Sequence, residues 1–438
     1  MKKLKVLRKY LLFVLFLSVY LATGCGGGSG SNPGSSSTTT TTSTTTATTT
    51  DTTATDTTAP TVSSTNPANG LTDVCINKNL KATFSEEMLA SSITNTTFTL
   101  AKTTGMVDEP GAVTLDGTKK VASFDPTADL LAGTNYTATI KSGANGVKDL
   151  AGNALASDYS WSFTTSATGV SCAAAPTLGR EAPFGAAGGG SGATNDGVNS
   201  VINGDFATKA ILTADVTGWH DEPASSYTYG DNTPPHNNYD VYTETPVKHG
   251  QVTGRIYTCT VSTTGPTSGG VNAASCTKAN EAYDDALITY NTLEGTAGGL
   301  DPSGAGGELG GLTLFPGVYK ALNQVTFKVT LVDLTLDAQG DADAVWIFQI
   351  PAALTFGGPG DSRSIKLING AQAKNVFWQV GSSATLNPAG DGTFEGNIYA
   401  RTKVTISTTA IASVVTMNGR AIGFDAQTVI NNTIINLP

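Results

Sequence analysis

The chain has 438 residues, of which 14% are charged, and a formal net charge of −10, with an isoelectric point near 4.8. This acidic balance argues against a nucleic-acid-binding protein, and the length is sufficient for more than one domain. The sequence contains no phosphate-cradling glycine loop, no nucleophile elbow and no Cys/His spacing typical of zinc. We therefore predict neither an enzyme nor a cofactor.

Residues 1–24 have the layout of a secretory signal peptide. Basic residues precede an apolar run from Tyr10 to Ala22, which is too short for a comfortable membrane span. The run leads to Leu21-Ala-Thr-Gly-Cys25, which resembles a bacterial lipoprotein processing site and implies lipidation of Cys25. An ordinary cleaved signal with an unmodified cysteine is the alternative. We expect an exported protein anchored by lipid at the bacterial outer membrane or cell surface.

A low-complexity segment follows at residues 25–58. It consists almost entirely of Gly, Ser, Thr, Ala and Asp, and such a composition cannot bury a core. We expect a disordered tether, which at ~3.3 Å per residue reaches on the order of 100 Å. A lipid at one end and a spacer behind it predict a protein held away from a membrane surface.

Residues 59–166 alternate short apolar strands with turn residues, as in a small antiparallel β-sandwich. The expected strands are Val62–Pro67, Leu80–Phe84, Phe98–Leu100, Val121–Phe124, Tyr136–Ile140 and Tyr159–Phe163. The phrases Thr83-Phe-Ser-Glu-Glu-Met88, Val147-Lys-Asp-Leu-Ala-Gly-Asn153 and Trp161-Ser-Phe-Thr-Thr165 resemble the bacterial Ig-like domain of surface-layer and adhesin proteins. The resemblance implies a structural spacer. We interpret its acidic residues as solvated turn carboxylates rather than a cation site, namely Glu86, Glu87 and Asp149.

Four cysteines remain besides Cys25, an even number that can pair in an exported chain. Cys75 and Cys172 are one candidate pair, which would close the base of the Ig-like domain. Cys259 and Cys276 bracket a Ser/Thr/Gly-rich loop, and a bridge there contributes about 3 kcal/mol in the chain-entropy model. Spacing alone leaves the connectivity open.

One helix is predicted over Thr277–Glu294. Its apolar residues recur at three- and four-residue steps, namely Ala279, Ala282, Tyr283, Ala286, Leu287, Tyr290 and Leu293. Thr277 is the expected N-cap. The small residues and tyrosines of this stripe favour packing along a flat sheet face.

One pattern occurs four times between Val345 and Asn432: an apolar pair, a break, and a second apolar pair. The expected inward residues are Phe348, Ile350, Leu354 and Phe356, then Trp378, Val380, Ala384 and Leu386, then Ile398, Ala400, Val404 and Ile406, then Ile422, Phe424, Thr428 and Ile430. This spacing is typical of two short strands that meet at a corner. Because the copies begin 30, 20 and 24 residues apart, we predict stacked coils of a β-solenoid with insertions at the corners.

Longer phrases in residues 175–438 resemble the microbial ice-binding protein family. They include Gly310-Gly-Leu-Thr-Leu-Phe-Pro-Gly-Val-Tyr319, Ala344-Val-Trp-Ile-Phe-Gln-Ile350 and Val414-Val-Thr-Met-Asn-Gly-Arg-Ala421. The resemblance implies an all-β-dominated fold, an irregular right-handed three-faced β-solenoid with one α-helix alongside. It also implies that one flat face adsorbs to ice, so we expect an antifreeze or ice-adhesion protein.

The inward register assigns the outward residues of the second strand in each coil. Thr355, Thr385 and Thr405 form one column, which Val429 ends, while Lys403 and Gln427 interrupt the face. The expected ice-binding residues are Thr355, Ser382, Ser383, Thr385, Asn387, Thr402, Thr405 and Ser407. Threonine carries a hydroxyl and a methyl on a stiff β-branched side chain, so stacked threonines form a rigid lattice that orders water. The structural alternative is that threonine simply suits strands.

Other functional interpretations are weaker. A surface adhesin that binds glycans would use the tyrosine-rich insertion, with Tyr227, Tyr229, Tyr239 and Tyr242. An enzyme on a β-solenoid would need paired carboxylates facing a groove, and none emerges in the coils. We expect corner turns rather than a calcium loop at Asp337, Asp341 and Asp343. We predict no metal site from the widely spread His220, His236 and His249.

Overall fold

The computed structural model of the protein describes residues 56–221, 229–230, 238–322, 325–358, 362–388, 392–407, 414–425 and 428–438. The expected signal peptide, Cys25 and nearly all of the expected tether lie outside these ranges. Within them, no helix has both the length and the apolar character that a membrane crossing requires.

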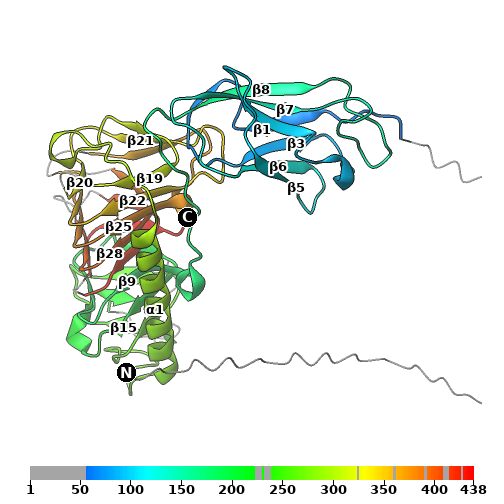
Figure 1. Cartoon of the computed structure of the whole chain (residues 1–438). Helices are drawn as coiled ribbons and strands as arrows, with labels where there is room; N and C mark the ends of the chain where they lie inside the picture. Colours follow the sequence, from blue (N-terminus) through cyan, green and yellow to red (C-terminus); the bar gives the residue numbers. More distant parts are fainter. Residues whose placement is uncertain are drawn as a thin grey trace, which may run out of the picture. The chain divides into compact units, whose positions relative to one another are not determined.

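The Ig-like part is a β-sandwich of two four-stranded sheets, ordered β1-β3-β6-β5 and β2-β8-β7-β4 (Figure 1). Its strands are β1 (Val62–Asn66), β2 (Leu71–Val74), β3 (Leu80–Phe84), β4 (Phe98–Lys102), β5 (Gly111–Leu115), β6 (Val121–Pro126), β7 (Asn135–Ile140) and β8 (Tyr159–Thr165), with a 3₁₀ helix η1 (Ala90–Ser92). All six expected strands are present. The two that sequence reasoning missed, β2 and β5, are edge strands with little buried apolar surface.

Aromatic side chains fill the space between these two sheets. Phe98 is fully buried, and its ring centroid lies 5.6 Å from that of Phe124 and 5.8 Å from that of Trp161. Cys75, directly after β2, is bonded to Cys172, which lies beyond the end of β8. The disulfide therefore joins the end of β2 to the segment that follows β8, and strands β3 to β8 lie between the two cysteines.

The remaining strands stack as the coils of a β-solenoid, which confirms the expected fold class. We follow three sides along the stack, each in stacking order. Side one contains β17 (Ile256–Thr258), β12 (Asp205–Thr208), β9 (Phe184–Gly188), β31 (Ala421–Gly423), β28 (Asn397–Ala400), β25 (Val376–Val380), β22 (Trp346–Ile350) and β19 (Gly317–Lys320). Side two contains β13 (Val216–Thr217), β10 (Ala193–Asn195), β32 (Thr428–Ile430), β29 (Val404–Ile406), β26 (Ala384–Leu386), β23 (Leu354–Phe356) and β20 (Phe327–Val329).

Side three is made of two sheets. The first contains β15 (Val241–Tyr242), β14 (Trp219–His220), β16 (Gly250–Val252), β11 (Val201–Asn203), β33 (Thr433–Asn436), β30 (Val415–Asn418) and β27 (Thr393–Glu395). The second contains β24 (Ile365–Ile368), β21 (Leu334–Asp337) and β18 (Thr313–Leu314). Short 3₁₀ helices lie between the strands: η2 (Gly179–Glu181), η3 (Thr213–Asp215), η5 (Ala305–Gly307) and η6 (Ala373–Asn375).

The coils do not stack in the order of the sequence. The N-terminal coil, β9 to β11, lies inside the stack: β9 pairs with β12 and β31, and β10 pairs with β13 and β32. Its last strand, β11, pairs with β16 and with the C-terminal strand β33. The helix α1 (Ala273–Gly295) connects β17, at one end of side one, to the coil that contains β19 at the other end (Figure 1). The C-terminal coil therefore rests directly on the N-terminal one.

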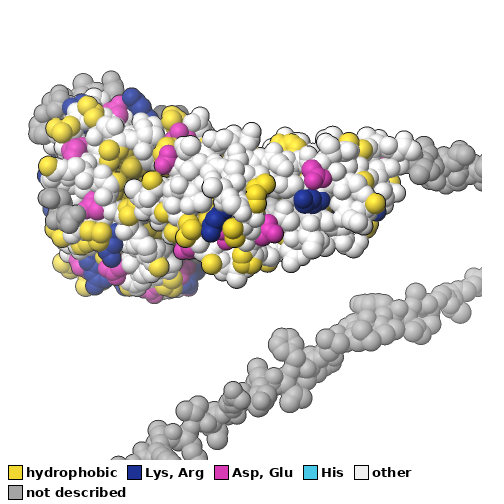
Figure 2. Space-filling model, turned by 45° about the horizontal axis from the view of Figure 1, so that its top comes forward, with side chains coloured by type: hydrophobic (Ala, Val, Ile, Leu, Met, Phe, Trp, Pro, Cys, Tyr) yellow, Lys and Arg dark blue, Asp and Glu magenta, His cyan; other side chains and the backbone are white. Residues whose placement is uncertain are grey.

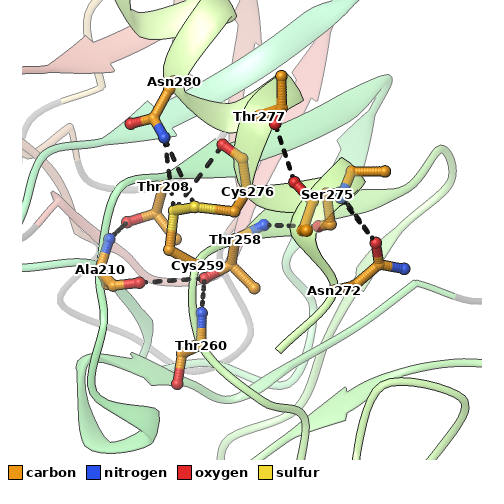
Figure 3. Close-up of a disulfide and its surroundings, with 12 residues drawn as sticks. Thr208, Ala210, Thr258, Cys259, Thr260, Asn272, Ser275, Cys276, Thr277 and Asn280 are labelled. Carbon is orange, nitrogen blue, oxygen red and sulfur yellow. Dashed lines mark hydrogen bonds between the residues drawn. A yellow bond between two sulfur atoms is a disulfide. The ribbon is translucent and has the colours of Figure 1, made fainter. Parts of the chain in front are cut away.

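Helix α1 begins four residues before the predicted start and has a different cap. The side chain of Asn272 accepts hydrogen bonds from the backbone N–H groups of Ala274 and Ser275 at 3.0 and 3.1 Å. Thr277 was the wrong N-cap, because it lies inside the helix and its hydroxyl donates to the carbonyl of Ala273. The first turn is largely exposed and carries none of the buried apolar residues of the stripe, so apolar periodicity gives no signal there. A disulfide between Cys276 and Cys259 links this turn to the residue after β17 (Figure 3).

Side one is buried on both faces, because its outward residues pack against α1. Phe377, Tyr399 and Ile422 join Ala282, Ala286 and Tyr290 in one apolar cluster. This explains an error in the fourth repeat, where Ala421 and Gly423 align with Ile398 and Ala400, whereas Ile422 and Phe424 face the helix. The expected inward register of that strand was wrong by one residue. Alternation cannot identify the inner face of a strand when both faces are apolar.

A buried polar group lies between side one and α1. The carboxylate of Glu181, in η2, accepts a hydrogen bond from the hydroxyl of Thr289 in α1. Nearby, Arg420 donates to Asn397 Oδ1 at 2.8 Å and to the carbonyl of Ala182 at 2.7 Å. Burial raises the pKa of Glu181 to about 7, although its hydroxyl neighbours and Arg420 act in the opposite direction. The folded chain therefore holds a proton on Glu181 more tightly than the unfolded chain does.

We expect Glu181→Gln to flatten the pH dependence of the solenoid's stability. The folded pKa of Glu181 is about 7, so its contribution is most favourable below the unfolded pKa of about 4.3. As the pH rises through 7, the wild type loses up to roughly 3 kcal/mol of unfolding free energy, and the variant does not. Urea unfolding at about pH 5 and about pH 8, followed by the circular dichroism of α1, measures the difference.

The matched control is Glu294→Gln, at an exposed position of the same helix. It should keep the wild-type slope of stability against pH. A Glu181→Gln variant with the wild-type slope would contradict the assignment.

Candidate functional site

Two of the three solenoid sides are accessible to a flat ligand. The outward residues of side one are covered by α1. On sides two and three, inward residues such as Leu354 and Met417 are fully buried, whereas outward residues such as Thr355 and Thr416 are partly exposed. The choice of face therefore lies between sides two and three.

Side two carries the column of threonines expected from the sequence. Thr355 pairs with Thr385, Thr385 with Thr405, and Thr405 with Val429, in one unbroken parallel register. Between these outward positions the strands place buried apolar residues, among them Leu354, Phe356, Ala384, Leu386, Val404 and Ile406. The alternation holds the threonines on one face and the core on the other.

The column continues past Val429 into strands that sequence reasoning did not place there. Val429 pairs with Thr194, and Thr194 pairs with Thr217. At the opposite end, Lys328 pairs with Thr355 and ends the column. The available signal was Ala193-Thr-Asn195, which repeats the small-threonine order of Ala384-Thr-Leu386. We call the outward surface formed by Thr217, Thr194, Thr405, Thr385 and Thr355 the threonine face.

The three central hydroxyls of the threonine face point away from protein partners. Thr355, Thr385 and Thr405 are partly exposed, and their hydroxyls form no hydrogen bond to any other residue in the described ranges. Thr217 differs, because its hydroxyl donates to that of Thr194 at 3.1 Å. Each central threonine hydroxyl can therefore donate one hydrogen bond to, and accept two from, a ligand or water molecules on the face.

The other expected ice-binding residues flank this column. Ser382 and Thr402 lie at the corner before it, where the Thr402 N–H donates to the Ser382 carbonyl at 2.8 Å. Ser383 is partly exposed next to them. On the opposite edge, Ser407 donates to Asn387 Oδ1 at 3.4 Å.

Two residues were expected to interrupt the face. Lys403 is exposed, next to the column. Gln427 lies outside the described residues. Two lysines therefore border the threonine face: Lys403 lies beside the column, and Lys328 lies at one end of it, next to Thr355.

Side three presents a different surface. Its outward threonines Thr393 and Thr416 are paired in register and are followed by Ile434. Beside them runs a chain of amides, in which Asn203 donates to Asn436 at 2.7 Å, Asn436 to Asn418 at 3.0 Å, and Asn418 to Glu395 Oε1 at 2.9 Å. These amides satisfy one another, so this column stabilises the stack rather than offering free donors.

The glycan-binding alternative receives little support from the described residues. Tyr242 is 1% exposed and is part of the solenoid core, so it was wrongly included in an exposed patch. Tyr229 is exposed and its ring lies 5.6 Å from that of His249, and Tyr239 is partly exposed. Tyr227 lies outside the described residues.

Potential metal ligands converge at one place in the described ranges, the carboxylates of Asp56, Glu86 and Asp149 in the Ig-like part. Asp149 is buried there and accepts hydrogen bonds from the backbone and side chain of Asn153, both at 2.8 Å.

His220 pairs with Glu244 at 2.6 Å, and His236 lies outside the described residues. Asp337 accepts from the N–H of Gln339 at 2.8 Å, as expected of a corner turn. Charged side chains on the visible surface are scattered among uncharged ones (Figure 2).

Two family models match the chain. Residues 187–436, more than half of its length, match the model described as ice-binding-like, and residues 56–165 match the bacterial Ig-like domain. Ice-binding protein 1 of Shewanella frigidimarina is 41% identical over 135 residues, which are 30% of this chain and 14% of that protein. The ice-binding protein of a Leucosporidium species is 31% identical over 244 residues, 55% of this chain and 76% of that protein.

A solved structure is also similar. The DUF3494 domain of the Shewanella frigidimarina protein is 26% identical, with a TM-score of 0.46, and the match covers 60% of this chain and 98% of that domain. The chain spans less than two thirds of the length of the curated relatives from Shewanella, Colwellia, Nostoc and Flavobacterium frigoris.

We expect Thr385→Val to leave the unfolding free energy within about 0.5 kcal/mol of the wild type, because its hydroxyl has no partner to lose among the described residues. The contrasting variant is Thr208→Val on side one, where the buried hydroxyl donates to the Gly189 carbonyl at 3.0 Å and accepts from the Ala210 N–H at 3.1 Å. That substitution leaves the Ala210 N–H without this acceptor, whereas the Gly189 carbonyl keeps its hydrogen bond from the Gly192 N–H, and it should cost about 1–3 kcal/mol. Urea unfolding of both variants measures the contrast, and equal losses would show that the Thr385 hydroxyl supports the fold.

Proposed function

The chain belongs to the ice-binding-like family, and from that premise we propose that it binds ice through the threonine face. The observation that carries this choice of face is the in-register column of Thr355, Thr385 and Thr405, whose hydroxyls have no partner among the described residues. In the first sheet of side three the corresponding column is shorter, because Thr393 and Thr416 pair in register but are followed by Ile434, and the neighbouring amides bond to one another.

The spacing of the column suits an ordered layer of water. Neighbouring strands lie about 4.8 Å apart, and same-face residues along a strand lie about 6.7 Å apart. Each threonine adds a methyl group that faces water and a hydroxyl that can hydrogen-bond it. Water confined over this regular surface approaches the order of ice, so adsorption costs less than it would on an irregular surface.

Rigidity of the face follows from the packing beneath it. Phe348 and Trp378 stack on each other with ring centroids 3.9 Å apart and planes inclined by 7°. Phe356 and Phe394 meet edge to face at 5.1 Å. A close-packed interior of this kind keeps the strands from shifting, and a surface that does not move keeps its match to a crystalline ligand.

Anchoring at a bacterial surface completes the proposed function. The residues that carry it are the signal-like segment 1–24, Cys25 and the Thr-rich tether that precedes the Ig-like spacer. A lipid at Cys25 would hold the ice-binding solenoid at the end of a long tether. The protein would then attach the cell to ice or modify the ice around it.

Ice partitioning and thermal hysteresis of residues 56–438 test the ligand and its face together. Thr385→Tyr combined with Thr405→Tyr places two bulky rings on the threonine face and should abolish most of the activity. The matched control is Thr393→Tyr combined with Thr416→Tyr, the equivalent adjacent pair on side three, which should retain it. Both double variants should fold, because all four positions point outward.

Each outcome separates one part of the proposal from another. Loss of activity only in the side-three variant would move the site to side three. No ice partitioning by the wild type would refute ice as the ligand and make glycan binding the next measurement.

The anchor is tested separately with Cys25→Ser in the full-length chain expressed in a bacterial host. We expect the wild type to partition into the detergent phase with the membranes and the variant to lose this association, because a thioether-linked lipid cannot form on serine. Ice binding of the extracted protein should be the same in both, which serves as the control for folding. A wild-type chain that remains in the aqueous phase would contradict the anchor.

A further inference from the structure

We propose that the Cys75–Cys172 disulfide is a mechanical clamp: when the chain is pulled between its N-terminal segment and the solenoid, the load crosses the disulfide and bypasses strands β3–β8 of the Ig-like domain. The two cysteines are 97 residues apart in sequence, yet their Cα atoms lie 5.4 Å apart. The disulfide therefore closes a loop of chain between the two cysteines, which would reach ~340 Å at ~3.5 Å per residue if it were fully extended.

The Ig-like domain has two weakly held strands on the N-terminal side of the path. Load from the N-terminal side first reaches β1 and then β2, and both are edge strands of their sheets. β1 pairs only with β3, and its register is irregular between Val62 and Ser64. β2 pairs only with β8, and its register shifts between Leu71 and Val74. A strand paired on one side is held by a single hydrogen-bonded ladder, so only that ladder must break for the strand to detach.

The disulfide lies directly behind these two strands. Residues on either side of it are also joined non-covalently, because the Ser166 N–H donates to the Val74 carbonyl at 2.7 Å and the Ile76 N–H to the Val170 carbonyl at 2.9 Å. Asn77 holds the backbone of Cys172 through both its donor and its acceptor, at 3.1 and 2.6 Å. The detachment of β1 and β2 therefore stops at Cys75, and strands β3 to β8 remain in a loop that carries no load.

The attachment on the solenoid side is built differently. After Cys172 the chain reaches Arg180, whose guanidinium donates to both carboxylate oxygens of Asp285 on α1, at 2.8 and 2.9 Å. This hydrogen bonding from Arg180 lowers the pKa of Asp285 to about 2, so the pair stays charged over the ordinary pH range. The next strand, β9, is held on both sides, by β12 and by β31.

The C-terminal strand β33 is likewise held between β11 and β30. To extract either terminal strand of the solenoid, two ladders must break at once. The solenoid should therefore resist a higher load than the edge strands of the Ig-like domain. The clamp protects the weaker of the two domains.

The role of the clamp in a living cell rests on the anchoring proposed above, whereas its mechanics do not. A tethered protein that adsorbs to a crystal bears any force between cell and ice along its whole chain. The experiment below needs neither ice nor lipid, so its failure and a failure of the proposed function are distinguishable.

Single-molecule force spectroscopy of residues 26–438, held by handles at the two ends, tests the clamp. The wild type should show the unfolding steps of the solenoid. Its Ig-like domain should add no more length than that of the segment before Cys75. Cys75→Ala combined with Cys172→Ala should add a step of ~340 Å, and this step should come before any step of the solenoid. The control, Cys259→Ala combined with Cys276→Ala, opens a loop of sequence separation 17 and should add only ~60 Å.

A second measurement covers the case in which the double variant does not fold. A single molecule of the Cys259→Ala, Cys276→Ala control is pulled before and after a thiol reductant is added, and the ~340 Å step should appear only afterwards. A wild-type molecule that already shows this step would overturn the proposal. So would an unclamped Ig-like domain that stays folded until the solenoid has been extended.

Discussion

Parallel, in-register pairing of strands is the constraint on which the rest of the solenoid depends. Because each strand lies directly over the equivalent strand of the next coil, equal positions form columns that run the length of the stack. Inward columns become the core, as in the stacked rings of Phe348 and Trp378. Outward columns become surfaces with a regular repeat, and the threonine face is one of them. One geometric rule thus generates both the rigidity and the periodicity that binding to a crystal requires.

Helix α1 decides how the three sides are used. By covering side one with small residues such as Ala282 and Ala286, it removes that side from contact with any ligand and leaves two sides open. The cover also buries polar groups, since Glu181 and Arg420 lie beneath it. Burial raises the pKa of Glu181 to about 7, so the contact between helix and sheet is coupled to pH. The same elements that shield one face therefore set the conditions under which the stack is most stable.

The two disulfides link the ends of secondary-structure elements. Cys259–Cys276 links the exposed first turn of α1 to the end of β17, and Cys75–Cys172 joins the end of β2 to the segment after β8. Neither lies in the solenoid core, where aromatic packing and, for most strands, ladders on both sides hold the sheets together. Disulfides are expected for a chain that works outside the reducing cytosol.

Residue patterns by themselves determined the elements that depend on local alternation: the six strands of the Ig-like sandwich, the inward pairs of the first three repeats, the helix stripe and the column of Thr355, Thr385 and Thr405. These patterns failed at Ile422, whose strand packs against apolar residues on both of its faces. They also failed at Asn272, the N-cap of α1, which precedes the first apolar residue of the helix stripe. Only the tertiary structure decided that Thr194 and Thr217 extend the threonine face and that α1 covers side one. Thr194 and Thr217 join the face because β10 pairs with β32, more than 200 residues further along the chain, and no local pattern records which distant coils become neighbours.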